Sequence, residues 1–193
     1  INNINIKKIK KKNIDLCAAP GGKSFQILSL NKSIIMNDKS KSRIKLMKEN
    51  LVRLKFKTKI FNYDVLKLES KEKYDLIILD APCSALGTIR KNPEIFFKKN
   101  GPEFDYLCNL QSKMLEKSVD LLNENGSILY MVCSFIECES TSQITKFLGK
   151  YKNFYLEKFL NKENDYEHNS LIKSGMMLTL PSKYKGFNID GYF

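Results

Sequence analysis

Short apolar runs alternate with amphipathic segments along the chain, and this alternation limits the possible folds more than any other feature of the sequence. Five runs have the length of buried strands and occupy residues 13–19, 33–37, 58–62, 74–80 and 126–134. Three segments carry apolar residues three and four positions apart, which predicts helices at 22–30, 41–54 and 106–122. This rhythm predicts an α/β fold in which helices cover both faces of a mainly parallel sheet.

Sheets of this class bind their ligands just beyond the carboxyl ends of the strands. The polar, acidic and thiol residues at the ends of the five expected strands are Cys17, Asn37–Asp38, Asn62–Asp64, Asp80 and Cys133. We therefore expect the functional site at this edge of the sheet. The sequence has no internal repeat and no long linker, so residues 1–193 are predicted to form a single domain.

The charge of the chain favours a polyanionic partner. Its 33 basic and 21 acidic residues give a net charge of +12 at pH 7, which indicates nucleic acid before an anionic membrane surface. A general abundance of Lys, Asn and Ile is the alternative explanation. No apolar run approaches the roughly 18 residues of a membrane span, so no membrane association is predicted.

Five cysteines and one histidine restrict the chemistry further. The number of cysteines is odd and no C-x-x-C pair occurs, which argues against a disulfide framework and against a zinc site. No metal is therefore expected. A reducing intracellular compartment follows, with the cytoplasm, the nucleus or nucleolus, and an organelle all open.

The stretch DLCAAPGGKS, residues 15–24, ends like a phosphate-binding loop but cannot serve as one. In the pattern G-x-x-x-x-G-K-[ST], the first glycine turns the chain around the phosphates. That position is Cys17 here, and Pro20 has no N–H group to donate. A G-x-G-x-x-G fingerprint is absent as well. The glycine pair instead lets the backbone approach a ligand closely at the start of a helix.

Asp38 is a candidate ligand for a nucleoside. In dinucleotide-binding folds, an acidic residue about 20 positions after the glycine loop binds the ribose hydroxyls, and Asp38 lies at about that offset. A nucleoside without a triphosphate, such as S-adenosyl-L-methionine, fits both features. A tight strand-to-helix turn with Asp38 as an ordinary helix cap fits them equally well, so these residues alone leave both interpretations open.

Two cysteines are predicted to converge. Cys83 follows Asp80 in the segment DAPCSALGTIRKNPE, and Cys133 ends the fifth apolar run. If the strands that precede them are neighbours, both thiols reach the same part of the site. A lone buried cysteine is usually inert packing, whereas two thiols beside a ligand carboxylate favour a catalytic role.

Four segments, DLCAAPGGKS, DAPCSALGTIRKNPE, YMVCSFIECE and LPSKYKGFNIDGYF, resemble in order and spacing the signatures of the NOL1/NOP2/Sun family of RNA cytosine-5 methyltransferases. The resemblance extends from Ile14 to Phe193. It implies the Rossmann-like fold of the class I S-adenosylmethionine-dependent methyltransferases. It also implies an RNA substrate, with ribosomal RNA preferred over tRNA. We expect a monomer.

The resemblance also implies which residues hold the cofactor. The methionine part would be held by the backbone of Cys17, Ala18, Ala19, Pro20, Gly21, Gly22 and Lys23. Asp38 would bind the ribose and Asp64 the adenine amino group, while Arg43 would support the site. Asp80 would lie near the methionine amine and the target base.

For the reaction, the resemblance implies that Cys133 is the nucleophile and that Cys83 releases the product. C5 of cytosine is too weak a nucleophile to take a methyl group unaided, and a thiolate that adds to C6 makes C5 reactive. Asp80 is the candidate donor or relay to ring N3, and Cys83 the candidate base for the C5 proton. The target cytosine must be unstacked, and Arg90 would lie nearer the RNA.

The sequence departs from the family pattern at Val132, where threonine is usual, at Ala85, where glycine is usual, and at Ser140, where asparagine is usual. None of these positions carries a reacting group, so we expect activity. Family members have upstream helices and often a separate RNA-binding domain. Because this chain begins just before the first strand, we expect that region to be absent.

Two rival functions remain. One is a non-catalytic RNA-binding or ribosome-assembly module, which the presence of both Cys83 and Cys133 argues against. The other is a different S-adenosylmethionine-dependent enzyme, acting on adenine or on a small molecule. DAPC is not the Asn/Asp-Pro-Pro-aromatic motif that adenine-N6 chemistry requires. Cys108 is expected in a helix core and His168 in a polar loop.

Overall fold

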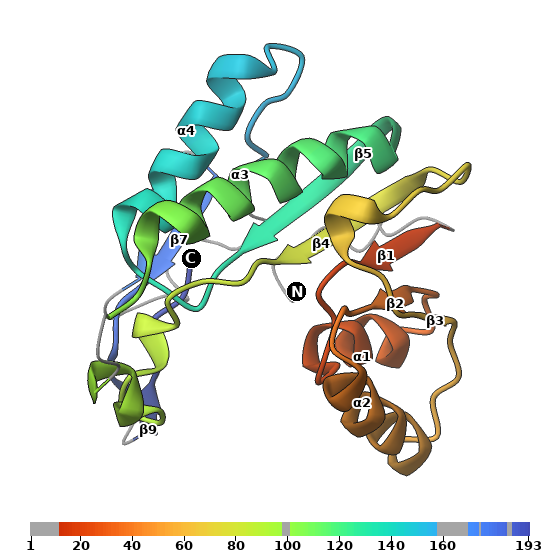
Figure 1. Ribbon diagram of the computed structural model, residues 1–193, viewed down its shortest axis with the longest axis horizontal. Coiled ribbons are helices and arrows are strands. Elements are labelled where there is room, and N and C mark those ends of the chain that lie inside the picture. Colours follow the sequence, from red (N-terminus) through yellow and green to blue (C-terminus); the bar gives the residue numbers. More distant parts are fainter. Residues whose placement is uncertain (1–11, 98–100, 158–169, 174, 185–186) are drawn as a thin grey trace. The chain divides into compact units, whose positions relative to one another are not determined.

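The computed structural model describes residues 12–97, 101–157, 170–173, 175–184 and 187–193 (Figure 1). Two compact units are present. The first consists of Ile1–Asp80 and Met114–Tyr130, and the second of Ala81–Lys113 and Met131–Phe193. The expectation of one domain over residues 1–193 stays a prediction, and His168 lies outside the described residues.

A five-stranded sheet dominates the first unit. Its strands are β1 (Asn13–Asp15), β2 (Ile35–Asn37), β3 (Ile60–Phe61), β4 (Tyr74–Asp80) and β5 (Leu122–Met131). Their order is β3-β2-β1-β4-β5, with β1 parallel to β2 and β4, and β2 parallel to β3. The expected mainly parallel sheet is therefore confirmed.

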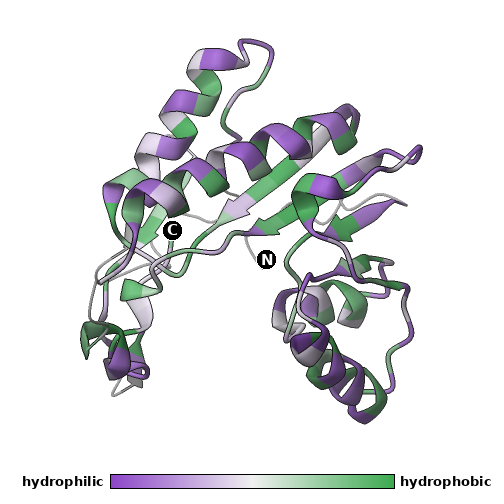
Figure 2. Ribbon diagram, viewed as in Figure 1, coloured by the Kyte–Doolittle hydropathy of each residue, from purple (hydrophilic) through white to green (hydrophobic). Residues whose placement is uncertain are grey.

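The central strands are apolar at successive positions, because both faces of the sheet are covered. In β4, Leu76, Ile77, Ile78 and Leu79 are all at most 2% exposed. Figure 2 shows hydrophobic residues along this strand. Ile14 of β1 pairs with residues of both neighbouring strands, Ile35 of β2 and Ile77 of β4.

Three helices connect the strands: α1 (Gly22–Ser29), α2 (Lys41–Arg53) and α3 (Phe104–Leu121). From β1, the sheet extends through β2 and β3 in one direction and through β4 and β5 in the other. With right-handed connections, the helices that serve the two directions lie on opposite faces. Ligands bind where the direction changes, which in this sheet is between β1 and β4.

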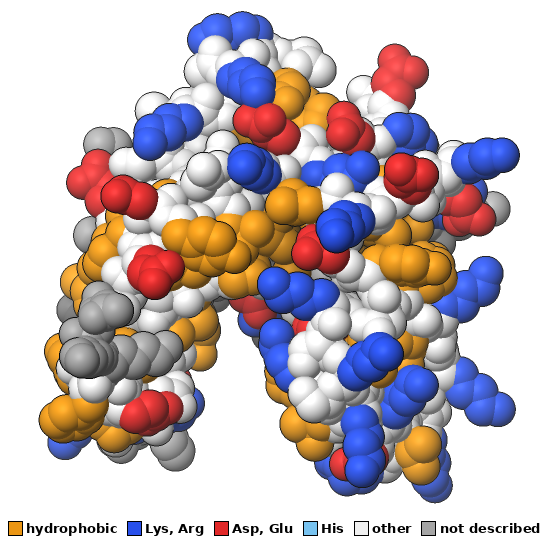
Figure 3. All heavy atoms as spheres, in the orientation of Figure 1, with side chains coloured by type: hydrophobic (Ala, Val, Ile, Leu, Met, Phe, Trp, Pro, Cys, Tyr) orange, Lys and Arg blue, Asp and Glu red, His pale blue; other side chains and the backbone are white. Residues whose placement is uncertain are grey.

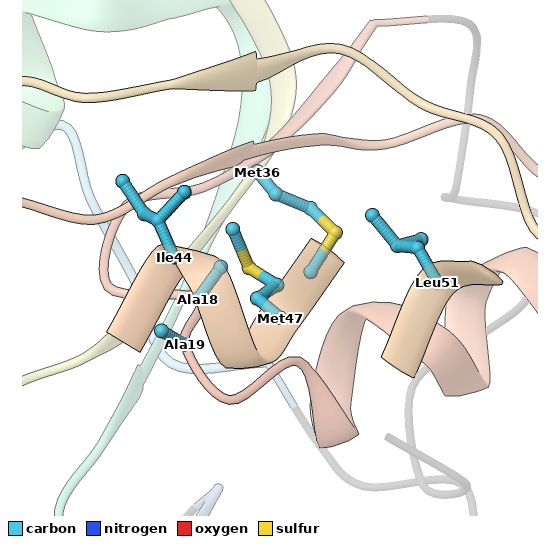
Figure 4. Packing of buried hydrophobic residues seen from close by; sticks show 6 residues of the cluster. All are labelled: Ala18, Ala19, Met36, Ile44, Met47 and Leu51. Atoms are coloured by element: carbon cyan, nitrogen blue, oxygen red, sulfur yellow. The ribbon is translucent and has the colours of Figure 1, made fainter. Parts of the chain in front are cut away.

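Helix α2 packs on the sheet through the face that the sequence predicts. Ile44, Met47 and Leu51 are buried, whereas Leu54 follows the end of the helix and is 36% exposed. Figure 4 shows a core cluster in which the α2 residues meet the loop after β1 and strand β2; the cluster consists of Ala18, Ala19, Met36, Ile44, Met47 and Leu51.

The second unit contains short helices and two antiparallel hairpins. The helices are the 3-10 helices η3 (Leu86–Thr88), η4 (Pro93–Phe97) and η5 (Glu137–Glu139), and the α-helix α4 (Thr141–Lys150). The hairpins pair β6 (Ser170–Lys173) with β7 (Met176–Thr179), and β8 (Ser182–Tyr184) with β9 (Phe187–Ile189).

Strand β5 ends earlier than the sequence predicts, so Cys133 lies two residues beyond the strand instead of at its end. The backbone hydrogen bonds explain the difference. Ala81 N–H donates to the carbonyl of Met131 at 2.9 Å, and Val132 then exchanges two 3.0 Å hydrogen bonds with Phe193. At Val132 the backbone therefore pairs with the C-terminal residue, Phe193, and the strand does not continue.

Candidate cofactor and thiol sites

The loop between β1 and α1 is held by the ends of the neighbouring strands. Leu16 N–H donates to the carbonyl of Ile78 at 2.9 Å, and Ala18 N–H donates to that of Asn37 at 2.8 Å. The peptide bond before Pro20 is cis. Gly21 has φ 114°, and a Cβ there would lie 2.1 Å from the Phe25 ring. The backbone path therefore requires glycine at position 21.

Asp38 connects this loop to the start of α2. Its side chain is buried and accepts hydrogen bonds from Ala19 N–H at 3.2 Å and Ser40 N–H at 2.9 Å. Arg43 forms an ion pair with it at 3.4 Å and donates to the carbonyl of Ala19. The N-cap of α2 is Ser40, so Asp38 is not an ordinary helix cap.

Sequence reasoning missed the central role of Asn37, which is fully buried at the end of β2. Its amide nitrogen donates to the carbonyls of Leu16 at 2.9 Å and Tyr63 at 3.1 Å. Its Oδ1 accepts from Tyr63 N–H at 3.1 Å. One side chain thus ties together the loops that follow β1, β2 and β3. A polar residue at a predicted strand end was the available signal.

An ion pair joins the start of α1 to the end of β4. Lys23 Nζ lies 2.6 Å from Asp80 Oδ2, and each side chain is about a third exposed, 32% and 31%. Beneath them, Asp15 is buried and accepts a 2.8 Å hydrogen bond from Ser24 Oγ. Burial raises the pKa of Asp15 to about 7, and the Asp80 charge adds to this, while the Ser24 hydrogen bond acts in the opposite direction.

Cys17 is not suited to be a nucleophile. Burial, together with the negative charges of Asp15, Asp38 and Asp80, raises the pKa of its thiol well above the usual range. Asp64, the remaining residue of the expected cofactor set, accepts from Leu66 N–H at 3.0 Å at the start of the 3-10 helix η2 (Val65–Lys67).

The first unit therefore offers groups that fit S-adenosyl-L-methionine by their chemistry. The ammonium of Lys23 and the carboxylate of Asp80 complement the carboxylate and ammonium of an amino acid. Asp38 can accept hydrogen bonds from ribose hydroxyls and Asp64 from an amino group. Asp38, Asp64 and Asp80 belong to the loops or strand ends at the carboxyl edge of the parallel strands. Lys23 is the second residue of α1, the helix that follows β1.

In the second unit, the structure brings together the two thiols that the sequence predicts to converge. The Sγ atoms of Cys83 and Cys133 lie 3.2 Å apart, within hydrogen-bond distance. The hydrogen bond with Cys133 and burial raise the pKa of Cys83 above its usual range, against a lowering contribution from Ala85 N–H. Cys83 therefore keeps its proton at neutral pH, and either sulfur can be the donor in the contact between the two thiols.

Arg90, which is expected near the RNA, is bound to the C-terminal segment. Its Nη2 lies 2.8 Å from Asp190 Oδ1, and Lys91 Nζ lies 2.5 Å from Asp190 Oδ2. Burial raises the pKa of Asp190, but the hydrogen bonds and charges of Lys91 and Arg90 outweigh burial and hold it below its usual value. These contacts fix the segment that follows Cys83.

The other cysteines and possible metal ligands support no second centre among the described residues. Cys108 donates from its Sγ to the carbonyl of Cys138 at 3.2 Å, and burial raises the pKa of Cys108 to about 11. No three His, Cys, Asp or Glu side chains in the described ranges are grouped to hold a metal ion. Within the same ranges, no helix is long and apolar enough to cross a membrane.

Comparisons with known proteins agree with this arrangement. A family described as 16S rRNA methyltransferase RsmB/F matches residues 5–193. Ribosomal RNA small subunit methyltransferase B of Shewanella oneidensis is 32% identical over 185 residues, which is 93% of this chain and 41% of that protein. The protein of the same name from Photorhabdus laumondii is 36% identical over 148 residues, which cover 74% of this chain and 34% of the relative. The chain thus spans less than half the length of these relatives.

Solved structures give the same result. NSun6 from Pyrococcus horikoshii, crystallised with SFG, has a TM-score of 0.78 and 29% identity over 97% of this chain and 48% of its own. A methyltransferase homologue from the same organism, 22% identical over 94% of this chain and 59% of its own, matches the fold with a TM-score of 0.64. The Rossmann-like methyltransferase fold and the family resemblance are both confirmed.

SFG is an analogue of S-adenosyl-L-methionine, the cofactor of this family, so the cofactor expected from the sequence is also confirmed. By the match over residues 5–193, the chain belongs to the RsmB/F family of 16S rRNA methyltransferases.

Proposed function

We propose that the protein transfers a methyl group from S-adenosyl-L-methionine to C5 of a cytosine in RNA, through a covalent bond between Cys133 and C6 of the base. The Cys83–Cys133 sulfur contact of 3.2 Å carries this proposal. Two thiols in contact, of which one holds its proton, provide an attacking thiolate and a second group for proton transfer. The names of the relatives favour RNA of the small ribosomal subunit as the substrate.

The cofactor would be bound by the first unit. The backbone of Cys17 to Gly22 would contact the methionine part, whose charged ends would pair with Lys23 and Asp80. Asp38 would accept from the ribose, with Arg43 fixing its orientation, and Asp64 from the adenine amino group. The bound cofactor supplies a methyl group on a positively charged sulfur.

The reaction begins with addition of the Cys133 thiolate to C6 of the unstacked cytosine. The new C–S bond places electron density on C5, which takes the methyl group, while Asp80 relays to N3 a proton that returns to solvent when the C–S bond breaks. A base then removes the C5 proton, the C–S bond breaks, and the Cys133 thiolate is restored. One proton is released for each methyl group transferred.

Cys83 is suited to act as this base only after the adduct has formed. In the free enzyme, the largest contribution to the raised pKa of Cys83 is its hydrogen bond with Cys133. Once the Cys133 sulfur is bonded to carbon, it can no longer carry a negative charge beside Cys83, and the pKa of Cys83 falls. Cys83 can then lose its proton to water and take the proton from C5. Addition of Cys133 to C6 therefore comes first, and removal of the C5 proton by Cys83 follows it.

Single substitutions of the two cysteines test the assignment. Cys133→Ala should abolish methyl transfer and form no adduct, whereas Cys83→Ala should trap a covalent RNA–protein adduct that survives a denaturing gel. Cys108→Ala, which changes a thiol outside the pair, should behave as the unmodified protein. An adduct from Cys133→Ala but not from Cys83→Ala would reverse the roles. RNA binding without methyl transfer by the unmodified protein would favour a non-catalytic RNA-binding module.

A further inference from the structure

Glu139 is a buried acid that the proposed reaction does not use. It is 0% exposed and ends the 3-10 helix η5, six positions after Cys133. An ionised carboxylate without solvent costs several kcal/mol unless hydrogen bonds compensate. The hydrogen bonds that offset this cost therefore show which parts of the chain Glu139 holds in place.

The carboxylate of Glu139 fixes the loop around Cys83. Its Oε1 accepts from Ser84 N–H at 2.8 Å, and its Oε2 accepts from Ser84 Oγ at 2.5 Å. Gln111 Nε2 lies 3.1 Å from Oε1 and also donates to the carbonyl of Pro82 at 2.9 Å. The residues before and after Cys83 are thus both attached, directly or through one amide, to the same carboxylate.

The same network reaches the neighbour of Cys133. Ser84 Oγ lies 3.3 Å from the Oγ of Ser134, which is itself fully buried. Ser134 Oγ accepts from Ile136 N–H at 3.2 Å, at the start of the turn that leads to Glu139. The loop that carries Cys83 and the segment after Cys133 are therefore joined by buried hydrogen bonds.

We propose that Glu139 is a positioning residue for the thiol pair: its carboxylate joins the Pro82–Ser84 loop to the segment after Cys133 and holds the two sulfurs in contact. Its part in methyl transfer rests on the proposed function above, whereas the placement of the thiols can be measured without RNA or cofactor.

Glu139 also contributes to the division of roles between the thiols. Two titratable groups, Cys133 and Glu139, act on Cys83 among the described residues, and the negative charge of Glu139 helps to keep the pKa of Cys83 high. Without that charge the pKa of Cys83 falls, more of Cys83 is thiolate at a given pH, and its reaction with electrophiles is faster.

Glu139→Gln tests the charge with little change in shape. The glutamine oxygen can accept from Ser84 N–H and Gln111, and its NH₂ group can donate to Ser84 Oγ, because a hydroxyl also accepts. Glu137→Gln is the matched control, since Glu137 is exposed and lies two positions away. Alkylation of Cys83 by iodoacetamide, followed by peptide mass spectrometry, should shift to lower pH in Glu139→Gln and not in Glu137→Gln.

Ser84→Ala tests the geometry, because it removes one donor to Glu139 and leaves the carboxylate in place; Glu139→Ala removes all the acceptors. Both variants should form the Cys83–Cys133 disulfide several-fold more slowly with diamide, which accepts the two electrons and two protons that the thiols lose. In active protein, kcat for methyl transfer should fall while KM for S-adenosyl-L-methionine stays constant.

The proposal is overturned if Ser84→Ala and Glu139→Gln match the unmodified protein in both disulfide formation and the alkylation profile. Ser84→Ala keeps the geometric test decisive if Glu139→Ala does not fold. Absence of methyl transfer in the unmodified protein would count against the proposed function, and the two thiol measurements would still decide the role of Glu139.

Discussion

Asp15 is an acid in the first unit whose titration is strongly changed by folding. It is 1% exposed, and burial raises its pKa from 3.8 to about 7. The folded state therefore binds this proton more tightly than the unfolded state does. The contribution of the protonated acid to stability is complete below pH ~4 and is lost as the pH rises through 7.

Replacing Asp15 by Asn should remove this pH dependence, because asparagine stays neutral. Relative to the unmodified protein, the free energy of unfolding of Asp15→Asn should rise between pH 4 and pH 8 by on the order of a few kcal/mol. Urea unfolding at several pH values measures the difference. Asp120→Asn, at an exposed position, is the control and should follow the unmodified protein. Parallel pH curves for Asp15→Asn and the unmodified protein would contradict the assigned titration.

The three departures from the family pattern have different structural settings. Ala85 has φ 59°, a left-handed conformation that glycine adopts without strain. Val132 is fully buried and hydrogen-bonded to Phe193 through its backbone. Ser140 donates from its hydroxyl to the carbonyl of Ile136 at 2.8 Å. None of these contacts moves the Cys83 sulfur away from the Cys133 sulfur.

At the level of elements, the sequence predicts best what depends on local periodicity. The helix expected at 41–54 is observed at Lys41–Arg53, and the strand expected at 74–80 is β4. Strand ends are less predictable, because the partner that ends them is distant in sequence. Val132 reads as a continuation of β5, yet its hydrogen bonds go to Phe193, 61 positions later.

The same physical reason limits the prediction of the site. Cysteines and acids at strand ends are visible in the sequence because their side-chain chemistry is distinctive. The position of Asn37 at a strand end is visible too, but the supporting roles of Asn37 and Glu139 are not, since these roles depend on being buried beside particular backbone groups. Glu139 binds Ser84, 55 positions away, and no spacing rule connects the two. Buried polar supports are therefore found only from coordinates.

The segment after Cys83 and the C-terminal segment touch through two glycines. Gly87 N–H donates to the carbonyl of Cys133 at 3.0 Å, and Gly191 N–H donates to that of Gly87 at 2.7 Å. A Cβ at Gly87 would lie 1.9 Å from the Gly191 oxygen. Since the obstacle is backbone, a side chain at position 87 must move the chain next to Cys133.

Gly87→Ala should therefore lower methyl transfer strongly and destabilise the protein by about 1–3 kcal/mol, the usual range for overpacking. The control is Gly149→Ala in α4, where an added Cβ meets nothing within 4 Å. A helical Gly→Ala change should instead stabilise by up to about 1 kcal/mol. Denaturant unfolding and initial rates measure both effects. Equal stability and activity for the two variants would show that the contact between Gly87 and Gly191 is unimportant.

On the scale of the whole molecule, the positive charge is concentrated and not spread evenly. Residues 39–59, the basic segment, contain nine basic residues and one acidic residue. The other 172 residues contain 24 basic and 20 acidic residues. A general abundance of lysine does not explain this separation. All nine basic side chains are exposed on α2 and the adjoining loops; they are Lys39, Lys41, Arg43, Lys45, Lys48, Arg53, Lys55, Lys57 and Lys59. Figure 3 shows Lys and Arg side chains gathered over α2.

If the RNA backbone lies against the basic segment, replacing Lys45, Lys48, Lys55 and Lys57 together by Gln should weaken RNA binding. Each lost phosphate contact lowers the slope of log affinity against log salt by about 0.7–0.9, so the loss of four contacts should lower the slope by up to about 3–4. Binding of S-adenosyl-L-methionine should not change, because Arg43 and Asp38 remain. The control variant carries the same charge change at four exposed lysines elsewhere and should lose less affinity for RNA. These lysines are Lys71, Lys113, Lys146 and Lys152. Fluorescence anisotropy at several salt concentrations measures both variants, and equal losses would mean that net charge, not the basic segment, attracts the RNA.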